Sequence, residues 1–384
     1  MLKWQLLFWL RSYTVNNMDG FSYQFFNTTV SAWEEMKRCL SVAKKSIYWE
    51  IYALIDDAAG GSFIDILCQK AMSGLDVMLV VDAIGSYELS NKAKDKLKNS
   101  GVKFQVFHSL SPIIGLSSWW KRVWHRTHRK VLIIDEEVVF IGGVNIKESA
   151  RDWYDLHLKV TGRIARPLLY GFARTYINSG GRREEIKHLL HPKLTTGLAH
   201  LKDKVNFILH SPIYAAKKSP FKKVYYQTLD MAKESFNLLT PYYVPDREFI
   251  ELVSKAKKRG VKVNIILPWK TDIKFMEYMA RAFYGISQKA GAAFYFLKKM
   301  NHGKAVTADD KIGVVGSANF THRGLFLNQE AGVSFSQKEM IDDLNHILDD
   351  WKEEAVPMSD FNFNSKGWYR RFKDWWLNKF KDYV

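Results

Sequence analysis

The sequence contains few cysteines and no long apolar run. Its two cysteines, Cys39 and Cys68, are too few for a disulfide framework and are typical of a reducing compartment. Because no stretch of about twenty consecutive apolar residues occurs, we expect no transmembrane helix. No long tract rich in proline or glycine indicates disorder. These absences argue against a disulfide-stabilised secreted domain and against a membrane-spanning protein.

Acidic residues are too few to balance the basic ones. The chain has 40 Asp and Glu against 57 Lys and Arg, which gives a formal net charge of +17. Such an excess favours a polyanionic partner: a nucleic acid, a phospholipid surface or a phosphorylated substrate. Tryptophan is abundant, with 13 residues, and it is enriched both at membrane interfaces and on platforms that stack bases. Composition therefore indicates a polyanion and leaves lipid and nucleic acid as alternatives.

Four blocks of sequence recur in the same order, so the chain contains an internal repeat. Residues 43–57, 71–85, 97–107 and 127–145 resemble residues 232–246, 256–270, 287–297 and 301–319. Helix-like segments end at Gly74, Gly101, Gly260 and Gly291, and each is followed by a β-branched or aromatic run. We therefore expect an α/β fold of two similar halves related by a pseudo-two-fold axis. Each half should be a mixed, largely parallel sheet with helices on both faces, and the active site should lie at their interface.

The repeat divides the chain into five segments. A short apolar N-terminal segment (1–16) precedes the first half (17–180), and a linker (181–204) leads to the second half (205–356). A tail (357–384) follows. The first half is longer by about fifteen residues, because an insertion containing the stretch "SSWWKRVW" precedes its last repeated block.

The last repeated block carries the candidate chemistry, in the pattern His-x-Lys-x4-Asp-x6-Gly-[Gly/Ser]-x-Asn. Its members are His128, Lys130, Asp135, Gly142, Gly143 and Asn145 in the first half, and His302, Lys304, Asp309, Gly316, Ser317 and Asn319 in the second. In a strand, a His and a Lys two residues apart point to the same face. The following turn and returning strand bring the asparagine beside that face. Two halves face to face therefore present two imidazoles, two ammonium groups and two carboxamides.

This set of groups suits displacement at a phosphodiester. The lysines neutralise the non-bridging oxygens and the added charge of the transition state. One neutral imidazole attacks phosphorus, and the other, when protonated, delivers a proton to the leaving oxygen and then deprotonates the incoming hydroxyl. Because the lysines supply this electrostatic stabilisation, we expect no metal and no cofactor. His125 lies close to His128, but no further Cys or His ligands are nearby.

The doubled motif resembles that of the phospholipase D superfamily over about residues 20 to 355. Phrases such as "TPYYVPD" (240–246), "LPWKTD" (267–272) and "GSANFTHRGLFLNQE" (316–330) resemble those of bacterial cardiolipin synthases. Where that family usually has Asp-x-Arg-Ser after its second asparagine, this chain has Thr321, His322, Arg323 and Gly324.

The resemblance implies a role for each site residue. It makes His128 the nucleophile and His302 the general acid and base. The residues that would hold the phosphate are Lys130, Lys304, Asn145 and Asn319. Asp155 and Glu330 match the acids that orient the two imidazoles through their far nitrogens. Asp135 and Asp309 match structural residues that tie down a turn, and Ser317 is expected to line the substrate pocket.

Aromatic residues in the tail favour lipid over nucleic acid as the polyanion. Trp368, Phe372, Trp375, Trp376, Phe380 and Tyr383 fall on one face of a helix, with Lys and Arg on the remainder. This pattern is typical of a helix on an anionic membrane surface, and the alternative is a helix docked on the protein's own core. We expect Trp119 and Trp120 of the insertion to meet the lipid at the mouth of the site. A nucleic-acid enzyme would disperse its aromatics along a groove, so we expect no nucleic acid partner.

These observations predict a peripheral phosphatidyltransferase on the cytoplasmic side of the cell membrane. Its expected substrate is phosphatidylglycerol, which it would convert to cardiolipin through a phosphatidyl intermediate on His128. The alternatives are a phospholipase D-type hydrolase that uses water, an endonuclease of the same superfamily, and a lipid-binding scaffold with an inactive site.

Overall fold

The computed structural model describes residues 21–109, 124–162, 166–190, 204–212 and 219–360. Several predictions therefore concern residues outside the described ones: the apolar segment 1–16, Trp119 and Trp120 of the insertion, and the aromatic face of the tail. Within the described ranges, no helix has both the length and the apolar character that crossing a bilayer requires.

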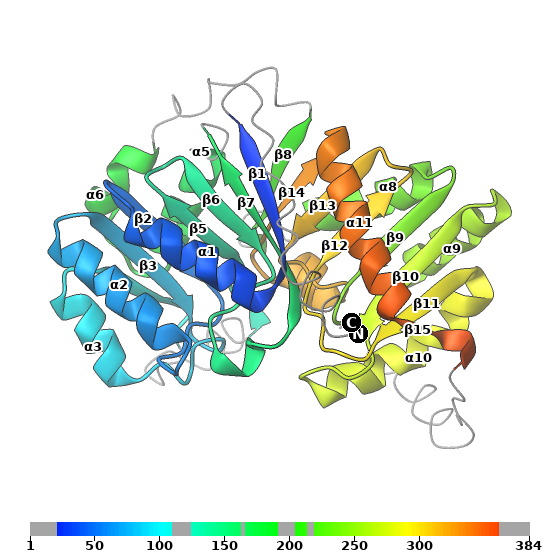
Figure 1. Cartoon of the computed structure of the whole chain (residues 1–384), viewed down its shortest axis with the longest axis horizontal. Coiled ribbons are helices and arrows are strands. Elements are labelled where there is room, and N and C mark those ends of the chain that lie inside the picture. The colour runs from blue at the N-terminus through cyan, green and yellow to red at the C-terminus, as the bar shows by residue number, and fades with distance from the viewer. Residues whose placement is uncertain (1–20, 110–123, 163–165, 191–203, 213–218, 361–384) are drawn as a thin grey trace, which may run out of the picture.

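The first half is a seven-stranded sheet with helices on both faces (Figure 1). Its elements are β1 (Ser22–Thr28), α1 (Thr29–Ser41), β2 (Ser46–Ile51), α2 (Gly60–Met72), β3 (Asp76–Asp82), α3 (Asn91–Asn99), β4 (Lys103–Phe107), β5 (Lys130–Ile134), β6 (Val138–Gly142), η2 (Glu148–Ala150), β7 (Tyr154–Thr161) and α5 (Arg166–Asn178). The strand order is β1-β7-β6-β5-β2-β3-β4.

The second half repeats this plan with eight strands. After α6 (Arg183–Ile186) and η4 (Lys187–Leu190), its elements are β8 (Val205–His210), α8 (Pro220–Met231), β9 (Ser235–Leu239), α9 (Arg247–Lys258), β10 (Lys262–Pro268), α10 (Lys274–Ala290), β11 (Ala292–Leu297), β12 (Ala305–Ala308), β13 (Ile312–Gly316), the π-helical turn η6 (Arg323–Leu327), β14 (Glu330–Phe335), α11 (Lys338–Glu354), β15 (Val356–Pro357) and η7 (Met358–Asp360). The strand order is β15-β11-β10-β9-β12-β13-β14-β8.

The α/β class and the mixed sheets are confirmed, but the expectation of largely parallel sheets is wrong. Among the strands that the structure describes, parallel ladders join only β2-β3-β4 in the first sheet and β9-β10-β11 in the second. All other ladders are antiparallel. The reason is that the β-α-β units supply only three strands per half. The motif strands are joined instead by tight turns, which reverse the chain and so produce antiparallel neighbours.

Side chains that cap helices and glycines mark the ends of the helices in the β-α-β units. The Ser90 hydroxyl accepts a hydrogen bond from the backbone N–H of Ala93 at the start of α3, and the Asp246 carboxylate accepts one from Phe249 at the start of α9. The predicted glycines Gly101 and Gly260 follow these two helices with φ of 89° and 82°. A left-handed backbone of this kind favours glycine, so the ends of the β-α-β helices match the sequence pattern.

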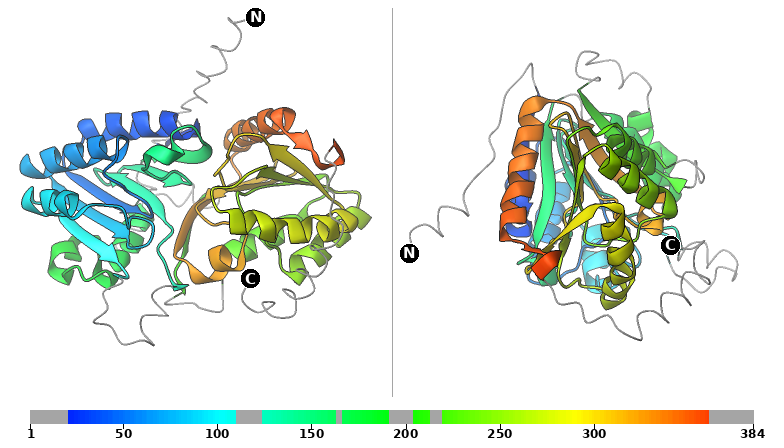
Figure 2. Two further views of the ribbon diagram at one scale, coloured as in Figure 1. Left: turned by 90° about the horizontal axis from the view of Figure 1, so that it is seen from below. Right: turned by 90° about the vertical axis from the view of Figure 1, so that its right-hand side faces the viewer.

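Each half has its own apolar cluster, and a further cluster joins the two halves. Separate clusters lie under α1–α3 in the first half and under α8–α10 in the second, and a third cluster contains residues of both sheets. Helix α5 of the first half contacts β8 of the second, while α11 of the second half contacts β1 of the first. The halves lie side by side, and β6 and β7 contact β13 and β14 (Figures 1 and 2). This reciprocal packing fixes the position of one half against the other.

The turn after each motif strand is held by the motif aspartate. Asp135 and Asp309 have φ of 53° and 51°, and the next residues, Glu136 and Asp310, are also left-handed. The Asp135 carboxylate accepts hydrogen bonds from the backbone N–H groups of residues 44–46, and Asp309 accepts them from residues 233–235. Both side chains therefore tie the turn to the strand beside it, at the opposite end of the motif strand from the histidine.

Candidate active site

Each motif histidine lies next to a carboxylate that belongs to the other half. The backbone N–H of His128 donates to the carbonyl oxygen of Gln329 at 2.9 Å, which sets His128 beside Glu330 at the start of β14. In the same way, the N–H of His302 donates to the carbonyl of Tyr154 at 2.7 Å, and Asp155 follows on β7. Two short backbone bridges across the interface thus bring the predicted site residues together.

The two imidazole–carboxylate contacts are close and buried. The Nδ1 atom of His128 lies 3.0 and 3.1 Å from the carboxylate oxygens of Glu330, and Nδ1 of His302 lies 3.0 Å from Oδ2 of Asp155. Burial alone would raise the pKa of both carboxyl groups, but the neighbouring histidines and lysines outweigh it and lower both values. Ionised carboxylates therefore hold Nδ1 protonated on each ring and leave the lone pair on Nε2.

The two motif lysines place buried positive charge between the halves. Nζ of Lys130 donates to the carbonyl oxygen of His128 at 2.8 Å and lies 5.0 Å from the ring centre of Tyr52. Nζ of Lys304 lies 2.9 Å from both ring nitrogens of His302. Burial lowers the pKa of Lys304 to about 8, while burial and the charge of Lys304 lower that of Lys130 well below its usual value. The charged forms of these lysines are thus disfavoured by burial and by mutual repulsion, and a bound anion would stabilise them.

Burial also keeps both imidazoles neutral at neutral pH. It lowers the pKa of His128 to about 4; Glu330 opposes this shift, and Lys130 and Lys304 add to it. The pKa of His302 is lowered by burial and by Lys304, against the opposing charge of Asp155. A neutral imidazole with a free Nε2 is the form that attacks phosphorus.

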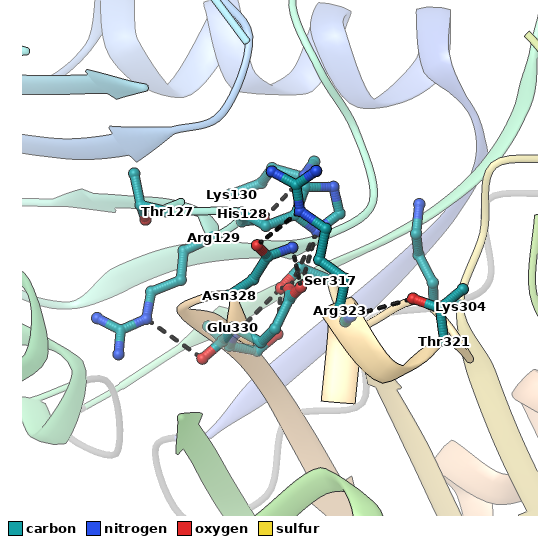
Figure 3. A network of polar contacts seen from close by, with 12 residues as sticks. Thr127, His128, Arg129, Lys130, Lys304, Ser317, Thr321, Arg323, Asn328 and Glu330 are labelled. Atoms are coloured by element: carbon teal, nitrogen blue, oxygen red, sulfur yellow. Dashed lines mark hydrogen bonds and ion pairs between the residues drawn. The ribbon is translucent and has the colours of Figure 1, made fainter. Parts of the chain in front are cut away.

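The motif asparagines and Ser317 complete the set of predicted residues. Asn145 and Asn319 are buried, and Oδ1 of each has no hydrogen-bond partner among the described residues. The Ser317 hydroxyl donates to Glu330 and accepts from the N–H of Ala331 at 3.0 Å, so it supports the carboxylate (Figure 3). A Cβ added to Gly143 would lie 2.0 Å from Oδ1 of Asp155, so only glycine fits there.

A buried polar network on the other face of the motif strand holds His128 in place. Arg126 bonds to the Asp82 carboxylate at 2.9–3.0 Å, and the N–H of Thr127 donates to the same carboxylate at 3.0 Å. Arg129 points away from the His128 ring, and its Nε donates to the backbone oxygen of Glu330 at 3.2 Å (Figure 3). These bonds anchor the residues on both sides of His128.

Sequence reasoning did not single out the aromatic residues that line the histidines. Tyr52 meets the His128 ring edge-on at 4.9 Å, and Trp153 lies 5.6 Å from the His302 ring. The Tyr242 hydroxyl donates to Asp272 at 2.5 Å, and Asp272 acts electrostatically on His302 and Lys304. Tyr52, Tyr242 and Asp272 lie in segments that are repeated or that resemble the family, and this was the only feature of the sequence that pointed to them. In the described parts of the chain, no three His, Cys, Asp or Glu side chains are grouped to hold a metal ion.

Comparison with known proteins agrees with the motif and the fold. A family model described as the phospholipase D-like domain of cardiolipin synthase matches residues 36–165 and 225–351. A cardiolipin synthase of Clostridium perfringens is 32% identical over 314 residues, which cover 79% of this chain and 64% of that protein. The minor cardiolipin synthase ClsB of Bacillus subtilis is 28% identical over 360 residues, covering 91% of this chain and 86% of the relative. The chain thus spans somewhat under two thirds of the length of the Clostridium relatives.

Solved structures show the same fold at low identity. The phosphatidylserine synthase of Haemophilus influenzae superposes with a TM-score of 0.68 at 14% identity, over 92% of this chain and 93% of that one. A polyphosphate kinase of Porphyromonas gingivalis gives a TM-score of 0.55 at 14% identity, over 85% of this chain and 46% of the kinase. With the family model matched in both halves, the chain belongs to the phospholipase D superfamily, in the family of cardiolipin synthase phospholipase D-like domains.

Proposed function

We propose that this protein is a phosphatidyltransferase that makes cardiolipin and glycerol from two molecules of phosphatidylglycerol. The observation that carries the proposal is the pair of buried histidine–carboxylate contacts flanked by Lys130 and Lys304. A neutral imidazole that attacks phosphorus, a second imidazole that carries and then regains a proton, and two ammonium groups match the charge and proton transfers of a two-step displacement at a phosphodiester. The named relatives are cardiolipin synthases, which supports cardiolipin as the product.

In the first step, Nε2 of His128 attacks the phosphorus of phosphatidylglycerol and the bond from phosphorus to the glycerol headgroup oxygen breaks. Glu330 accepts the hydrogen bond from Nδ1–H as positive charge develops on the ring. His302, which is protonated on Nε2 when the diester is bound, gives that proton to the leaving glycerol and keeps the Nδ1 proton that faces Asp155. The bound diester anion raises the pKa of His302, since its negative charge opposes that of Lys304.

In the second step, a hydroxyl of another phosphatidylglycerol replaces glycerol. His302, now neutral, removes the hydroxyl proton while the oxygen attacks phosphorus and the phosphorus–nitrogen bond to His128 breaks. The products are cardiolipin and the free His128 imidazole. Lys130, Lys304, Asn145 and Asn319 hold the phosphate oxygens in both steps. We place the enzyme on the cytoplasmic face of the cell membrane as a peripheral protein, in contact with anionic phospholipid and with no nucleic acid partner.

Incubating the purified full-length chain with phosphatidylglycerol in mixed micelles tests the function, with products identified by mass spectrometry. We expect cardiolipin and glycerol in equal amounts. A rapid quench in mildly alkaline denaturant, which spares the acid-labile phosphorus–nitrogen bond, should trap phosphatidyl-modified His128. The variants His128→Ala and His302→Ala should make neither product. Phosphatidic acid as the only lipid product would show a hydrolase instead, and cleaved DNA with unchanged lipid would show a nuclease.

A further inference from the structure

Exposed apolar side chains cluster on one helix beside the active site. Of the ten large apolar side chains that are most exposed among the described residues, four lie on α10 or directly before it: Ile273 at 46%, Phe275 at 56%, Tyr278 at 44% and Ile286 at 44%. The others are spread over both halves. Single exposed apolar residues are ordinary, but a group on one element indicates a binding surface.

Three of these side chains share one face of α10. At about 100° per residue, Phe275, Tyr278 and Ile286 fall within an arc of about 80°. The buried residues Met279, Ala280 and Tyr284 occupy the adjoining arc of the helix and pack on the protein. Helix α10 therefore has one wide apolar surface, of which one part is buried in the core and the neighbouring part is exposed. We call the exposed set Phe275, Tyr278 and Ile286 the α10 stripe.

The charge around the stripe is positive. Lys270, Lys274 and Lys289 are exposed at the two ends of the helix. Residues 269–290 contain four Lys or Arg and two acids, and one of those acids, Glu277, is paired with Arg281. An apolar face bordered by lysines is the composition of a helix that lies in the interface of an anionic bilayer.

The N-terminal end of the α10 stripe lies near the active-site residues. Asp272, two residues before α10, accepts a hydrogen bond from Tyr242 and acts electrostatically on Lys304, His302 and Tyr52. Arg323 acts on the same Tyr52, and its guanidinium lies 5.9 Å from the ring centre of Trp124, which is 45% exposed. Exposed apolar side chains therefore lie on two segments close to the residues that surround His128 and His302.

We propose that the α10 stripe is a membrane-docking surface that seats the active-site mouth on an anionic phospholipid bilayer. The protein's own residues 361–384 suit the stripe less well, because they carry six Lys or Arg and two Asp and would bring positive charge to positive charge. An anionic bilayer complements both segments. That the docked surface feeds lipid to His128 rests on the proposed function; the docking itself does not.

Sedimentation of the full-length chain with vesicles tests the surface. The probes are vesicles of phosphatidylglycerol and phosphatidylcholine in equal parts, with phosphatidylcholine vesicles for comparison. The variant Phe275→Ser/Tyr278→Ser/Ile286→Ser should need about tenfold more anionic lipid for half-maximal binding, since three apolar contacts with the bilayer are lost. The matched control is Met72→Ser/Met231→Ser, which removes side chains that are 70% and 68% exposed on other helices and should bind like the parent.

A second measurement reports the contact directly. An environment-sensitive fluorophore on Ile286→Cys should shift to shorter wavelength with anionic vesicles, while the same label on Met72→Cys should not. The native Cys39 and Cys68 are buried and so compete little for the label. Unchanged vesicle binding by the triple variant, or an unshifted label at position 286, would overturn the proposal.

Turnover in detergent micelles separates this proposal from the proposed function. The triple variant should keep micellar turnover within about twofold of the parent, because none of its substitutions touches the reacting groups. A parent that binds vesicles through the stripe but forms no cardiolipin in micelles would refute the phosphatidyltransferase and leave the docking surface standing.

Discussion

Replacing Glu330 by glutamine tests how much the carboxylate contributes to the reactivity of His128. The substitution keeps the size of the side chain and removes its charge, at a position that is fully buried and 3.0 Å from Nδ1 of His128. Two unit charges about 4 Å apart interact by about 4 kcal/mol at an effective dielectric constant of about 20. If half a unit charge develops on the imidazole in the transition state, the loss is about 2 kcal/mol, or about 30-fold in kcat.

Loss of the fixed tautomer adds to this electrostatic loss, so we expect kcat on micellar phosphatidylglycerol to fall by between about 30-fold and 300-fold. The pH profile should change as well. Glu330 raises the pKa of His128, so its removal should move the acid limb of kcat/KM to lower pH. Glu330 is a positioning residue, and a merely structural role would leave that limb where it is.

Two variants serve as controls for this experiment. Ser317→Ala removes a hydrogen bond to Glu330 but keeps the charge, and should lower kcat by less than about tenfold. Glu35→Gln removes a carboxylate that pairs with Arg38 and Lys159 on the α1 side of the first half, and should leave kcat unchanged. If Glu330→Gln keeps kcat within about threefold of the parent and leaves the pH profile unchanged, the reasoning is refuted.

Three further predictions concern the frame around the site. Gly143→Ala should abolish turnover because its Cβ would displace Asp155, whereas Gly61→Ala, which meets nothing within 4 Å, should keep full turnover in the same assay. His157 is buried, and burial is the chief reason that its pKa is lowered to about 4. Its contribution to stability is therefore complete above about pH 6.5 and is lost as the pH falls to about 4. The variant His157→Asn should remove up to about 3 kcal/mol of this pH dependence, which would appear as a smaller fall in Tm between those pH values. An equal fall in both proteins would contradict it. Asp309→Ala leaves three backbone N–H groups without their acceptor and should lower Tm by several degrees while folded enzyme keeps its kcat; a large loss of kcat without loss of Tm would assign Asp309 to the chemistry instead.

The repeated motif made the site largely predictable from sequence. His128 and His302 lie just before strands β5 and β12 and not within them, but each still lies beside the lysine two residues on, as the motif spacing suggested. The repeat also predicted two similar halves, because a glycine-terminated helix followed by an apolar run is a local signal. Local patterns of this kind determine local structure with little dependence on distant parts of the chain.

What the sequence did not predict depends on contacts between distant segments. The family resemblance pointed to Asp155 and Glu330 as the orienting acids but not to the histidine that each one contacts. His128 and Glu330 are 202 positions apart, and local spacing carries no information on that pairing. The antiparallel part of each sheet was missed for a similar reason, since the order of strands is set by how turns such as Asp135–Glu136 fold back. Tyr52 lies in a repeated block, but neither it nor Trp153 was singled out, because aromatic residues in strands and loops are most often part of the core.

The exchange of carboxylates between the halves makes the active site dependent on both of them at once. Neither half holds the acid that its own imidazole needs, so a half-length chain would be inert alone and would regain paired groups only by associating with a second half. Any opening of the interface separates both pairs together. Turnover therefore depends on contact between the two halves. In an unfolding experiment, enzyme activity should be lost when the halves separate, before either sheet unfolds.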